Sequence, residues 1–447
     1  MIKHLFQGQK VFAKRRELAI RKGTLGILDI GSSKITCFAL EFPKLSAVDS
    51  YESVDVVTIK SAPAFRVIGV SSTKSRGIRF GEIVEMEQTE QAIRTVISGA
   101  QKMAGKVVED VLVCFSGGRT KSYSLQGFSK VISAEVNSRD ISLAIGSCDF
   151  DSVDNQSFIL NAMPVNFSLD NKSKLSDPIG QVGDNLSVDL HVLTANDITV
   201  QNIINCVTNC YLQVIGVNFS PYLSGLSTLT EDEMQLGSVC IDFGAGITGF
   251  SIFFEKQLIY AGSVRLGGAH ITSDIMQAFQ ISYDAAERIK TLHGGVVQTS
   301  HDDRELIEIP NETDNWNEER TVVSRSELIG VIRPRVEEIL EKIKGELLHA
   351  GIGQLPSQKI ILCGGSSQLT GLHELASAHL NRQVRISRPM RVQGLPQAVG
   401  GPEFSAIIGQ ALQLSSPQDE SWDFLSTIDF VGGRRFLGAF NWIKENW

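Results

Sequence analysis

The sequence predicts an α/β fold made of two related domains, and two recurring features support this prediction. Strand-like and helix-like segments alternate along the chain, as they do in layered α/β proteins. A tight turn of Gly, Ser and Thr, preceded by an Asp and flanked by apolar runs, occurs at 25–34 and again at 239–248. Backbone N–H groups in such turns form concave anion sites. Two of them, each beside an acidic residue (Asp29 and Asp242), suit the phosphates of one nucleotide with a metal ion between them.

The composition limits the class of protein. The chain has 447 residues, of which 42% are hydrophobic, a net charge of −8 and a pI near 5.6. This length predicts more than one domain, and the acidic balance argues against nonspecific binding of nucleic acid, which needs a basic surface. Seven Cys without a Cys-x-x-Cys spacing indicate free thiols in a reducing compartment. We find no run of 18 apolar residues and no secretory signal, so we expect a protein on the cytoplasmic side.

Local patterns predict the remaining elements. Strands are expected at 26–40, on both sides of the first turn, and at 65–70, 111–116, 186–193 and 250–254. Helices are expected at 87–104, 196–211, 271–292, 326–349 and 405–414, with Pro334 kinking or restarting the fourth of them. Residues 1–23 are expected to be a mobile basic extension, and 301–320 an acidic surface loop. A third glycine site follows a strand at Gly364 and Gly365.

Three common nucleotide-binding motifs are excluded by their context. Gly244, Gly246 and Gly249 have dinucleotide-fold spacing, but a strand rather than a helix follows them. The Asp-Phe-Gly at 242–244 lacks the other protein-kinase motifs. The P-loop pattern is absent from the sequence.

Two strand–turn–strand phosphate clamps followed by a Gly-Gly site, in this order, resemble the actin/Hsp70/sugar-kinase ATPase superfamily. Within it, the chain from about residue 24 to 447 is similar to the FtsA family of bacterial cell-division proteins. The segments that carry the resemblance are 26–35, 67–70, 75–77, 112–118, 177–180, 273–275, 285–290 and 361–371. The resemblance implies an actin-like two-domain ATPase fold with an inserted FtsA-type subdomain.

The resemblance also implies a division of the chain. The first actin-like domain would comprise 24–85 and 168–223, interrupted by the inserted subdomain at 86–167. The second would comprise 224–265 and 331–403, with a small subdomain at 266–330. A returning helix would follow at 404–414, a tether at 415–433 and an amphipathic helix at 434–447.

Roles for individual residues follow from the same resemblance. Asp29 and Asp242 would hold Mg²⁺, mostly through water, unless they only stabilise their turns. ATP would contact Gly31, Ser32, Ser33, Lys34, Gly244, Ala245, Gly246, Thr248, Glu287, Arg288, Lys290, Gly364, Gly365 and Ser366. Alternatively, Lys34 is a solvated surface lysine that contacts no phosphate. Residues 287–290 could likewise form a solvated helix face and not a nucleotide contact. Gly249 stands where the family often has Asp, and we identify no water-activating base, so we expect at most slow ATP hydrolysis.

The small subdomain and the C-terminal segment are the expected contact regions. In the family, the C-terminal tail of FtsZ docks on the small subdomain. Three arginines near its edge could pair with an acidic peptide, namely Arg325, Arg333 and Arg335. The same residues are equally compatible with a solvated surface that binds no partner. As a helix, 434–447 gathers apolar side chains on one face with basic residues beside them. We expect it to bind anionic inner-membrane lipids through Arg434, Arg435, Phe436, Leu437, Phe440, Trp442, Ile443, Lys444 and Trp447, rather than to dock on its own domain.

The resemblance thus implies a mainly structural adaptor. It would bind ATP, self-associate into filaments and hold the FtsZ ring to the cytoplasmic face of the inner membrane at the division site, where it would also meet downstream division proteins. Two alternatives stay open. One is an ATP-dependent enzyme of the sugar-kinase type, and the other is an ATP-binding adaptor of a pilus or secretion machine.

Overall fold

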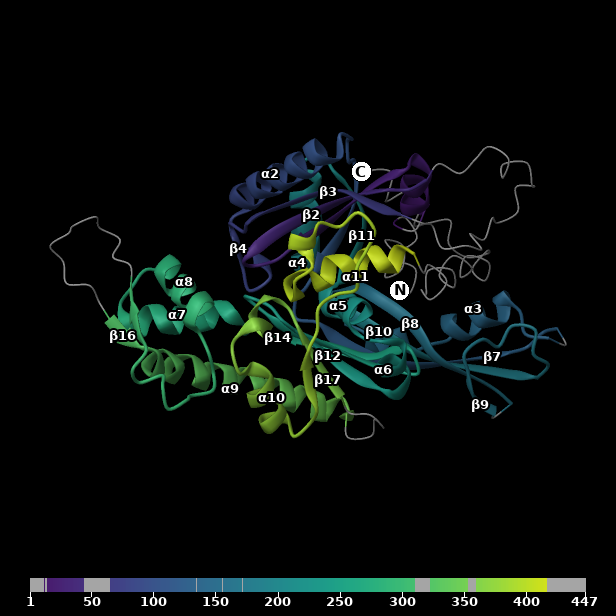
Figure 1. Ribbon diagram of the computed structural model, residues 1–447. Coiled ribbons are helices and arrows are strands. Elements are labelled where there is room, and N and C mark those ends of the chain that lie inside the picture. The colour runs from purple at the N-terminus through teal and green to yellow at the C-terminus, as the bar shows by residue number, and fades with distance from the viewer. Residues whose placement is uncertain are drawn as a thin grey trace.

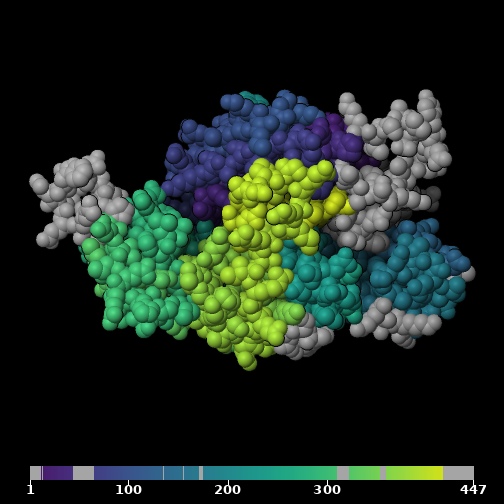
Figure 2. All heavy atoms as spheres, viewed as in Figure 1, coloured from purple at the N-terminus to yellow at the C-terminus, as the bar shows by residue number. Residues whose placement is uncertain are grey.

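A computed structural model describes residues 12, 14–43, 65–133, 135–154, 156–170, 172–309, 322–352 and 359–415. The predicted tether and amphipathic helix, 415–433 and 434–447, lie outside these residues apart from Ser415. Figure 1 shows two sheet-based domains, with a helical subdomain projecting at one end and a small sheet subdomain at the other. Figure 2 shows the same two projections in a space-filling view.

The first domain is built on a five-stranded mixed sheet in the order β11-β6-β1-β2-β3. β1 pairs antiparallel with β2, whereas β1, β6 and β11 run parallel. The carboxyl ends of these three parallel strands therefore meet at one edge of the sheet. The elements are β1 Thr24–Ile30, β2 Lys34–Glu41, β3 Arg66–Lys74, β4 Ile78–Arg79, β5 Glu82–Ile83, α2 Met86–Ala104, β6 Asp110–Phe115, α4 Asp197–Thr208 and β11 Gln213–Phe219.

The inserted subdomain has its own four-stranded sheet, in the order β7-β10-β8-β9, and its own apolar core. Its elements are β7 Lys121–Lys130, α3 Ser138–Gly146, β8 Ser157–Leu169, β9 Lys172–Leu175 and β10 Asn185–Asn196. The predicted bounds of 86–167 differ from this arrangement. α2 packs Ile93 and Val96 into the core of the first domain, and β6 is a central strand of the first sheet. Apolar periodicity identifies a strand or a helix but does not tell which sheet it joins.

The second domain repeats the plan with a five-stranded sheet in the order β14-β13-β12-β17-β18. Its elements are β12 Ser238–Phe243, β13 Thr248–Phe254, β14 Gln257–Val264, α9 Arg325–His349, β17 Lys359–Cys363, α10 Leu372–Leu380 and β18 Val384–Ile386, with the short α6 Glu231–Leu236 before them. Pro334 lies inside α9, which is one helix rather than two. Its apolar face, including Leu328, Ile332 and Ile339, is buried in the core of this domain.

The small subdomain consists of α7 Gly268–Phe279, α8 Tyr283–His293 and the hairpin β15 Leu306–Glu308 with β16 Val322–Ser324. The region predicted as helical at 271–292 is two helices. α7 is followed by Gln280, which adopts a left-handed backbone with φ of 53° and turns the chain towards α8. Of the predicted acidic loop, residues 310–320 lie outside the described part of the chain.

Two helices pack against each other between the domains, α5 Ser220–Thr228 and α11 Ser405–Leu414. They come so close that a Cβ at Gly409 would collide with the Leu223 carbonyl oxygen. The Ser227 hydroxyl donates to the Ser405 carbonyl oxygen at 2.8 Å. Because α5 follows β11 of the first sheet and packs on β12 of the second, it contacts both domains.

The basic N-terminal segment is partly folded onto the first domain. Residues 14–22 are helical, and Ala19 is fully buried in the core of this domain. The Lys22 ammonium lies 2.9 Å from the Asp110 carboxylate at the start of β6. The expectation of a mobile extension is therefore wrong for these residues.

Candidate functional site

A cavity of about 620 Å³ opens between the two domains, where the glycine turns face each other. Most of the predicted ATP-binding residues line it, namely Gly31, Ser32, Ser33, Lys34, Gly244, Ala245, Glu287, Lys290, Gly364, Gly365 and Ser366. Both predicted metal ligands, Asp29 and Asp242, line it as well. Gly246, Thr248 and Arg288 are not among the lining residues.

The first turn joins β1 to β2 and places Asp29 at the cavity. The Gly31 amide donates to the Lys34 carbonyl oxygen at 3.0 Å, which closes the turn. Burial raises the pKa of the Asp29 carboxyl to about 7, opposed by the charge of Lys34 and reinforced by that of Asp242. A carboxyl group with this pKa exchanges a proton near neutral pH.

The Lys34 side chain lies over the ring of Phe404, in the segment that leads into α11. Its ammonium lies 3.3 Å from the centroid of the Phe404 ring, a cation–π contact. Burial lowers its pKa, although Asp29, Glu403 and Asp242 favour the charged form. Lys34 is therefore not the solvated surface lysine of the alternative reading.

The second turn joins β12 to β13, and it holds the Asp242 carboxylate more firmly than the first turn holds Asp29. The Ser224 hydroxyl of α5 donates to Asp242 Oδ2 at 2.7 Å. Burial raises the pKa of Asp242, and the Ser224 hydrogen bond and Lys34 oppose this rise. Gly364, with φ of 82°, lies so close that a Cβ would collide with Asp242 Oδ1. The third glycine site is thus packed against the second turn.

Two residues predicted for the second turn have other contacts. Thr248 is fully buried, and its hydroxyl donates to the Leu266 carbonyl oxygen at 2.8 Å. Gly246 faces the first turn, since a Cβ there would lie 2.5 Å from Ser32 Oγ. Ser32 Oγ also accepts from the Gly81 amide at 3.1 Å. These contacts bring the two turns together without placing Thr248 or Gly246 on the cavity.

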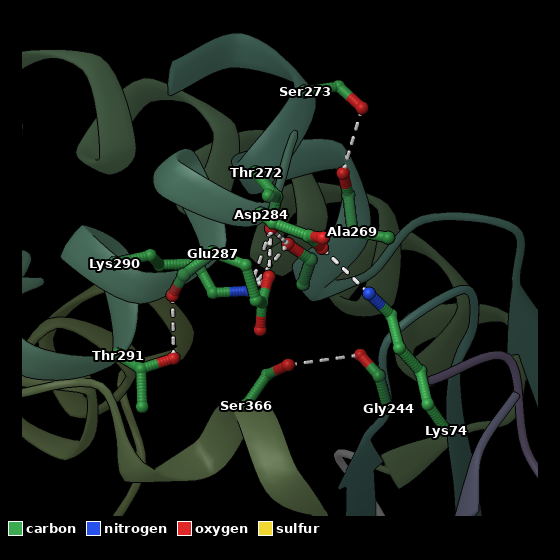
Figure 3. Close-up of polar contacts among 11 residues, drawn as sticks. Lys74, Gly244, Ala269, Thr272, Ser273, Asp284, Glu287, Lys290, Thr291 and Ser366 are labelled. Carbon is green, nitrogen blue, oxygen red and sulfur yellow. Dashed lines mark hydrogen bonds and ion pairs between the residues drawn. The ribbon is translucent and has the colours of Figure 1, made fainter. Parts of the chain in front are cut away.

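The far end of the cavity is formed by α7 and α8 (Figure 3). The Lys290 ammonium donates to the Gly268 carbonyl oxygen at 3.1 Å, to Thr272 Oγ1 at 2.8 Å and to Glu287 Oε2 at 2.6 Å. Burial lowers the pKa of Lys290, and Glu287 opposes this. Glu287 and Lys290 are thus a hydrogen-bonded pair at the cavity wall, whereas Arg288 is exposed and does not line the cavity.

Two further contacts in Figure 3 connect the parts of the site. Ser366 Oγ donates to the Gly244 carbonyl oxygen at 3.2 Å, which ties the third glycine site to the second turn. Lys74, at the end of β3, lies 2.7 Å from Asp284 of α8 and so bridges the first domain and the small subdomain.

The sequence analysis missed several lining residues, among them Ser116, Ser220, Tyr283 and Glu403. The sequence did contain a signal for Ser116 and Ser220. Ser116 and Ser220 directly follow the buried strands β6 and β11, whose carboxyl ends lie at the same sheet edge as the first turn. Ligands in α/β sheets bind outside such carboxyl ends.

The donor set fits a hard divalent cation. Two carboxylates at one cavity, with water and phosphate oxygens to complete the shell, are what Mg²⁺ prefers. Within the described ranges, no cluster of three or more His, Cys, Asp and Glu side chains is arranged to hold a metal by itself. A metal here would therefore depend on a bound ligand.

The three arginines predicted to bind an acidic peptide already have acidic neighbours. Arg325 lies 3.2 Å from Asp302 and 3.1 Å from Glu305. Arg335 contacts Asp274 at 2.6 Å and also Glu338. Arg333 is the most exposed of the three and contacts only Glu337 of its own helix, at 2.8 Å, among the described residues.

The predicted membrane-binding residues between Arg434 and Trp447 lie outside the described residues. Among the helices that the structure describes, we find none with the length and apolar character of a membrane-spanning segment.

Comparisons with known proteins match the whole site region. The family model described as "Cell division protein FtsA" matches residues 239–409, and the model of the SHS2 domain inserted in FtsA matches 117–194, which agrees with the sheet of β7 to β10. The cell division protein FtsA of Rhizobium meliloti (strain 1021) is 34% identical over 431 residues, with 95% of each chain covered. That of Neisseria meningitidis serogroup B is 30% identical, with 86% of this chain and 88% of the relative covered.

A solved structure with the same fold is a chain of the PilM–PilN type IV pilus biogenesis complex. It has a TM-score of 0.59 and 16% identity, and the match covers 88% of this chain and 98% of that one. At this identity the match indicates a shared fold only. The predicted actin-like fold with an inserted subdomain is confirmed, as is the family resemblance.

Proposed function

Since this chain belongs to the FtsA family of cell-division proteins, we propose that it is an ATP-binding adaptor that anchors the FtsZ ring to the membrane. The observation that carries the proposal is the cavity into which both glycine turns, both carboxylates and the third glycine site converge. Identity over almost the whole length of FtsA relatives favours this function over that of a sugar-kinase-like enzyme or a pilus adaptor.

ATP would lie with its phosphates at the two turns and its adenosine towards α8. Backbone N–H groups of such turns donate hydrogen bonds to anions, and Lys34 adds a positive charge near them. The Glu287 carboxylate, which Lys290 holds in place, presents an acceptor at the wall where ribose hydroxyls would lie. Gly364 and Gly365 leave room for a close approach of the ligand to the backbone.

Mg²⁺ would be held by Asp29 and Asp242 and would neutralise phosphate charge. Ser224 keeps the Asp242 carboxylate in one orientation before any ligand arrives. Because Gly249 stands where the family often has Asp, we propose at most slow hydrolysis. The protein would then act mainly through assembly, self-associating into actin-like filaments.

The FtsZ C-terminal tail would dock on the small subdomain. An acidic peptide at Arg325 or Arg335 has to displace acidic neighbours, whereas Arg333 is paired within its own helix and is half-exposed. Exposed ion pairs are weak, so exchanging Glu337 for a peptide carboxylate at Arg333 costs little. Arg333 is therefore the arginine that we propose as the principal contact.

Residues 434–447 would anchor the protein peripherally to anionic lipids of the inner membrane, on its cytoplasmic side at the division site. One short amphipathic helix binds membranes weakly and reversibly. Many tails arrayed on a filament would bind firmly, because linked binding events reinforce one another. Downstream division proteins would be recruited to the same assembly.

Co-pelleting with anionic liposomes in the presence of ATP and Mg²⁺ tests the adaptor function. The full chain should pellet, and the variant with both Phe440→Glu and Trp442→Glu should stay in the supernatant. Phe440 belongs to the apolar face of the predicted helix and Trp442 suits the membrane interface, and a charge at either position opposes insertion. Asn441→Glu, on the opposite face, is the matched control and should pellet like the unmodified chain. Equal pelleting of the double variant and the control would refute membrane anchoring by this segment.

A further inference from the structure

One edge of the first domain exposes large apolar side chains. β1, β6 and β11 run parallel, so their amino ends meet at the edge of the sheet that lies opposite the cavity. The Gln213 amide donates to the Glu109 carbonyl oxygen at 2.7 Å, where β11 and β6 begin. Val107 and Tyr211 each precede this hydrogen bond by two residues, and they are 70% and 93% exposed. Grouped apolar side chains of this kind indicate an interaction surface.

The helix at 14–22 adds positive charge to the same edge. Arg15 Nη1 donates to Gln213 Oε1 at 3.5 Å, and Lys22 Nζ lies 3.6 Å from the Glu109 carboxylate. The helix therefore borders the starts of both β6 and β11. Five of its nine residues are basic and one is acidic, in a chain whose net charge is −8.

Packing determines which face of this helix is turned outwards. Arg16 and Ala19 are buried against the first domain, whereas Lys14, Leu18 and Arg21 are exposed. The three exposed residues follow one another at spacings of four and three, which places them on one face of the helix. Leu18, which is 51% exposed, thus has cations beside it. An apolar side chain flanked by cations is typical of helices that lie at anionic membrane surfaces.

We propose that the exposed face of the helix at 14–22, together with Val107 and Tyr211, is a second membrane contact. We call this surface the basic edge. Its cations would bind anionic lipid headgroups, and its apolar side chains would enter the interfacial layer, where tyrosine is favoured. The inference rests on the proposed function, since it requires a chain that is anchored to the membrane.

A second contact would define how the body of the protein faces the lipid. Nineteen residues separate Leu414, the last residue of α11, from Arg434, the first residue of the proposed anchor. The anchor alone therefore does not determine which surface meets the membrane. Figure 1 shows the helix at 14–22 (purple) on the opposite side of the molecule from α7 and α8. Binding through the basic edge would leave the small subdomain accessible to the FtsZ tail.

Sedimentation of the full chain with phosphatidylcholine vesicles that contain phosphatidylglycerol tests the charges, with ATP and Mg²⁺ present and the lipid concentration varied. The variant with both Lys14→Glu and Arg21→Glu should bind about tenfold or more weakly, because anionic headgroups would repel it. On vesicles of phosphatidylcholine alone, it should bind like the unmodified chain. The matched control changes two exposed lysines of α9, Lys342→Glu with Lys344→Glu. It alters the net charge equally and should bind like the unmodified chain.

A second variant tests the apolar side chains. Val107→Ser with Tyr211→Asn should weaken binding by about fivefold, because less apolar surface enters the interface. Asn tolerates the left-handed backbone that Tyr211 adopts, with φ of 63°. Ile198→Ser is the control, since Ile198 is also 70% exposed but lies at the opposite end of α4. All substituted side chains are exposed, and unchanged melting temperatures would confirm that the variants are folded.

The outcomes separate this inference from the proposed function. If the unmodified chain binds and both variants of the basic edge bind equally well, the inference is overturned and the C-terminal anchor alone carries the binding. An equal loss in the α9 control would attribute the effect to net charge and would also overturn it. If the unmodified chain does not bind the vesicles, the proposed membrane anchoring fails and this inference with it.

Discussion

The two glycine turns are alike in sequence but differ in how the fold holds their carboxylates. Asp242 accepts a hydrogen bond from Ser224 and is packed against Gly364. Among the described residues, only the charge of Lys34 offsets the burial of Asp29, and the pKa of Asp29 rises to about 7. The second turn is therefore preorganised for a ligand, whereas the first turn gains or loses a proton near neutral pH.

This contrast suggests different contributions to ligand binding. An oriented carboxylate and a backbone shaped by glycine lose little freedom when a ligand arrives, so they contribute to affinity. A carboxyl group that must lose a proton makes the affinity depend on pH. Variants of the two turns should separate these contributions.

The largest effect is expected where the second and third glycine sites meet. Gly364→Ala should weaken ATP binding by about 100-fold, equivalent to roughly 3 kcal/mol. A side chain there would need a left-handed backbone and would collide with the Asp242 carboxylate. Gly400→Ala is the control, because Gly400 does not line the cavity and its Cβ would make only an ordinary contact, 3.5 Å from the Gln397 carbonyl oxygen. Calorimetric titration measures both, and equal losses would show that the backbone at Gly364 is not critical.

A smaller loss of ATP affinity is expected when the hydrogen bond that orients the Asp242 carboxylate is removed. Ser224→Ala should weaken Mg²⁺-dependent ATP binding by about 10- to 50-fold, because a hydrogen bond to a buried charged group is lost. Thr228→Val, one turn further along α5, removes a hydroxyl that donates to the Ser224 carbonyl oxygen and should leave affinity unchanged. Titrations with and without Mg²⁺ check this, and an equal loss in both conditions would contradict a role at the metal site.

The proton on Asp29 should make binding depend on pH. With a pKa of about 7, Asp29 is mostly charged at pH 8 and mostly neutral at pH 6.5, so Mg²⁺–ATP should bind about fourfold more weakly at pH 6.5. In Asp29→Asn this dependence should be greatly reduced, although affinity is lower at both pH values. A dependence that persists in Asp29→Asn would assign the proton to another group.

The same pKa predicts the direction of a stability change in the protein without nucleotide. The folded pKa lies above the ordinary value of 3.8, so the folded state binds more protons than the unfolded state between these values. The stability that the protonated Asp29 carboxyl contributes to the folded state is therefore lost as pH rises towards and through 7. Thermal melting at pH 5 and pH 8 should show this loss in the unmodified chain and a smaller one in Asp29→Asn.

The smallest effect on binding is expected at Thr248. Thr248→Val should leave ATP affinity within about twofold and lower stability by about 1 kcal/mol, because it removes a buried hydrogen bond to Leu266 rather than a ligand contact. Melting curves and titrations together separate the two effects. A tenfold loss of ATP affinity with an unchanged melting temperature would show that Thr248 contacts the nucleotide.

Sequence reasoning identified the residues at the turns because glycine and aspartate patterns are local. Asp29, Asp242 and Gly364 could all be found at the ends of apolar runs, and the helix at 405–414 has the bounds that its pattern predicted. Thr248 also follows the local pattern but points away from the cavity, because side chains alternate across a strand.

What the sequence did not reveal depends on tertiary packing. Ser220 follows an ordinary buried strand, and only the arrangement of β1, β6 and β11 brings it to the turns. The same holds for the bounds of the inserted subdomain, since α2 and β6 carry patterns that fit either sheet. The helix at 14–22 was missed because its basic residues concealed the few apolar contacts, such as that of Ala19, that hold it.

Calorimetric titration of the full chain with ATP, in Mg²⁺ and again in excess chelator, tests most directly whether the two turns form one nucleotide site. We predict one ATP per chain, bound about tenfold or more weakly without the metal, and loss of this metal dependence when Asp29 and Asp242 are both changed to Asn. Absence of ATP binding, or binding that neither Mg²⁺ nor these substitutions affect, would contradict the account.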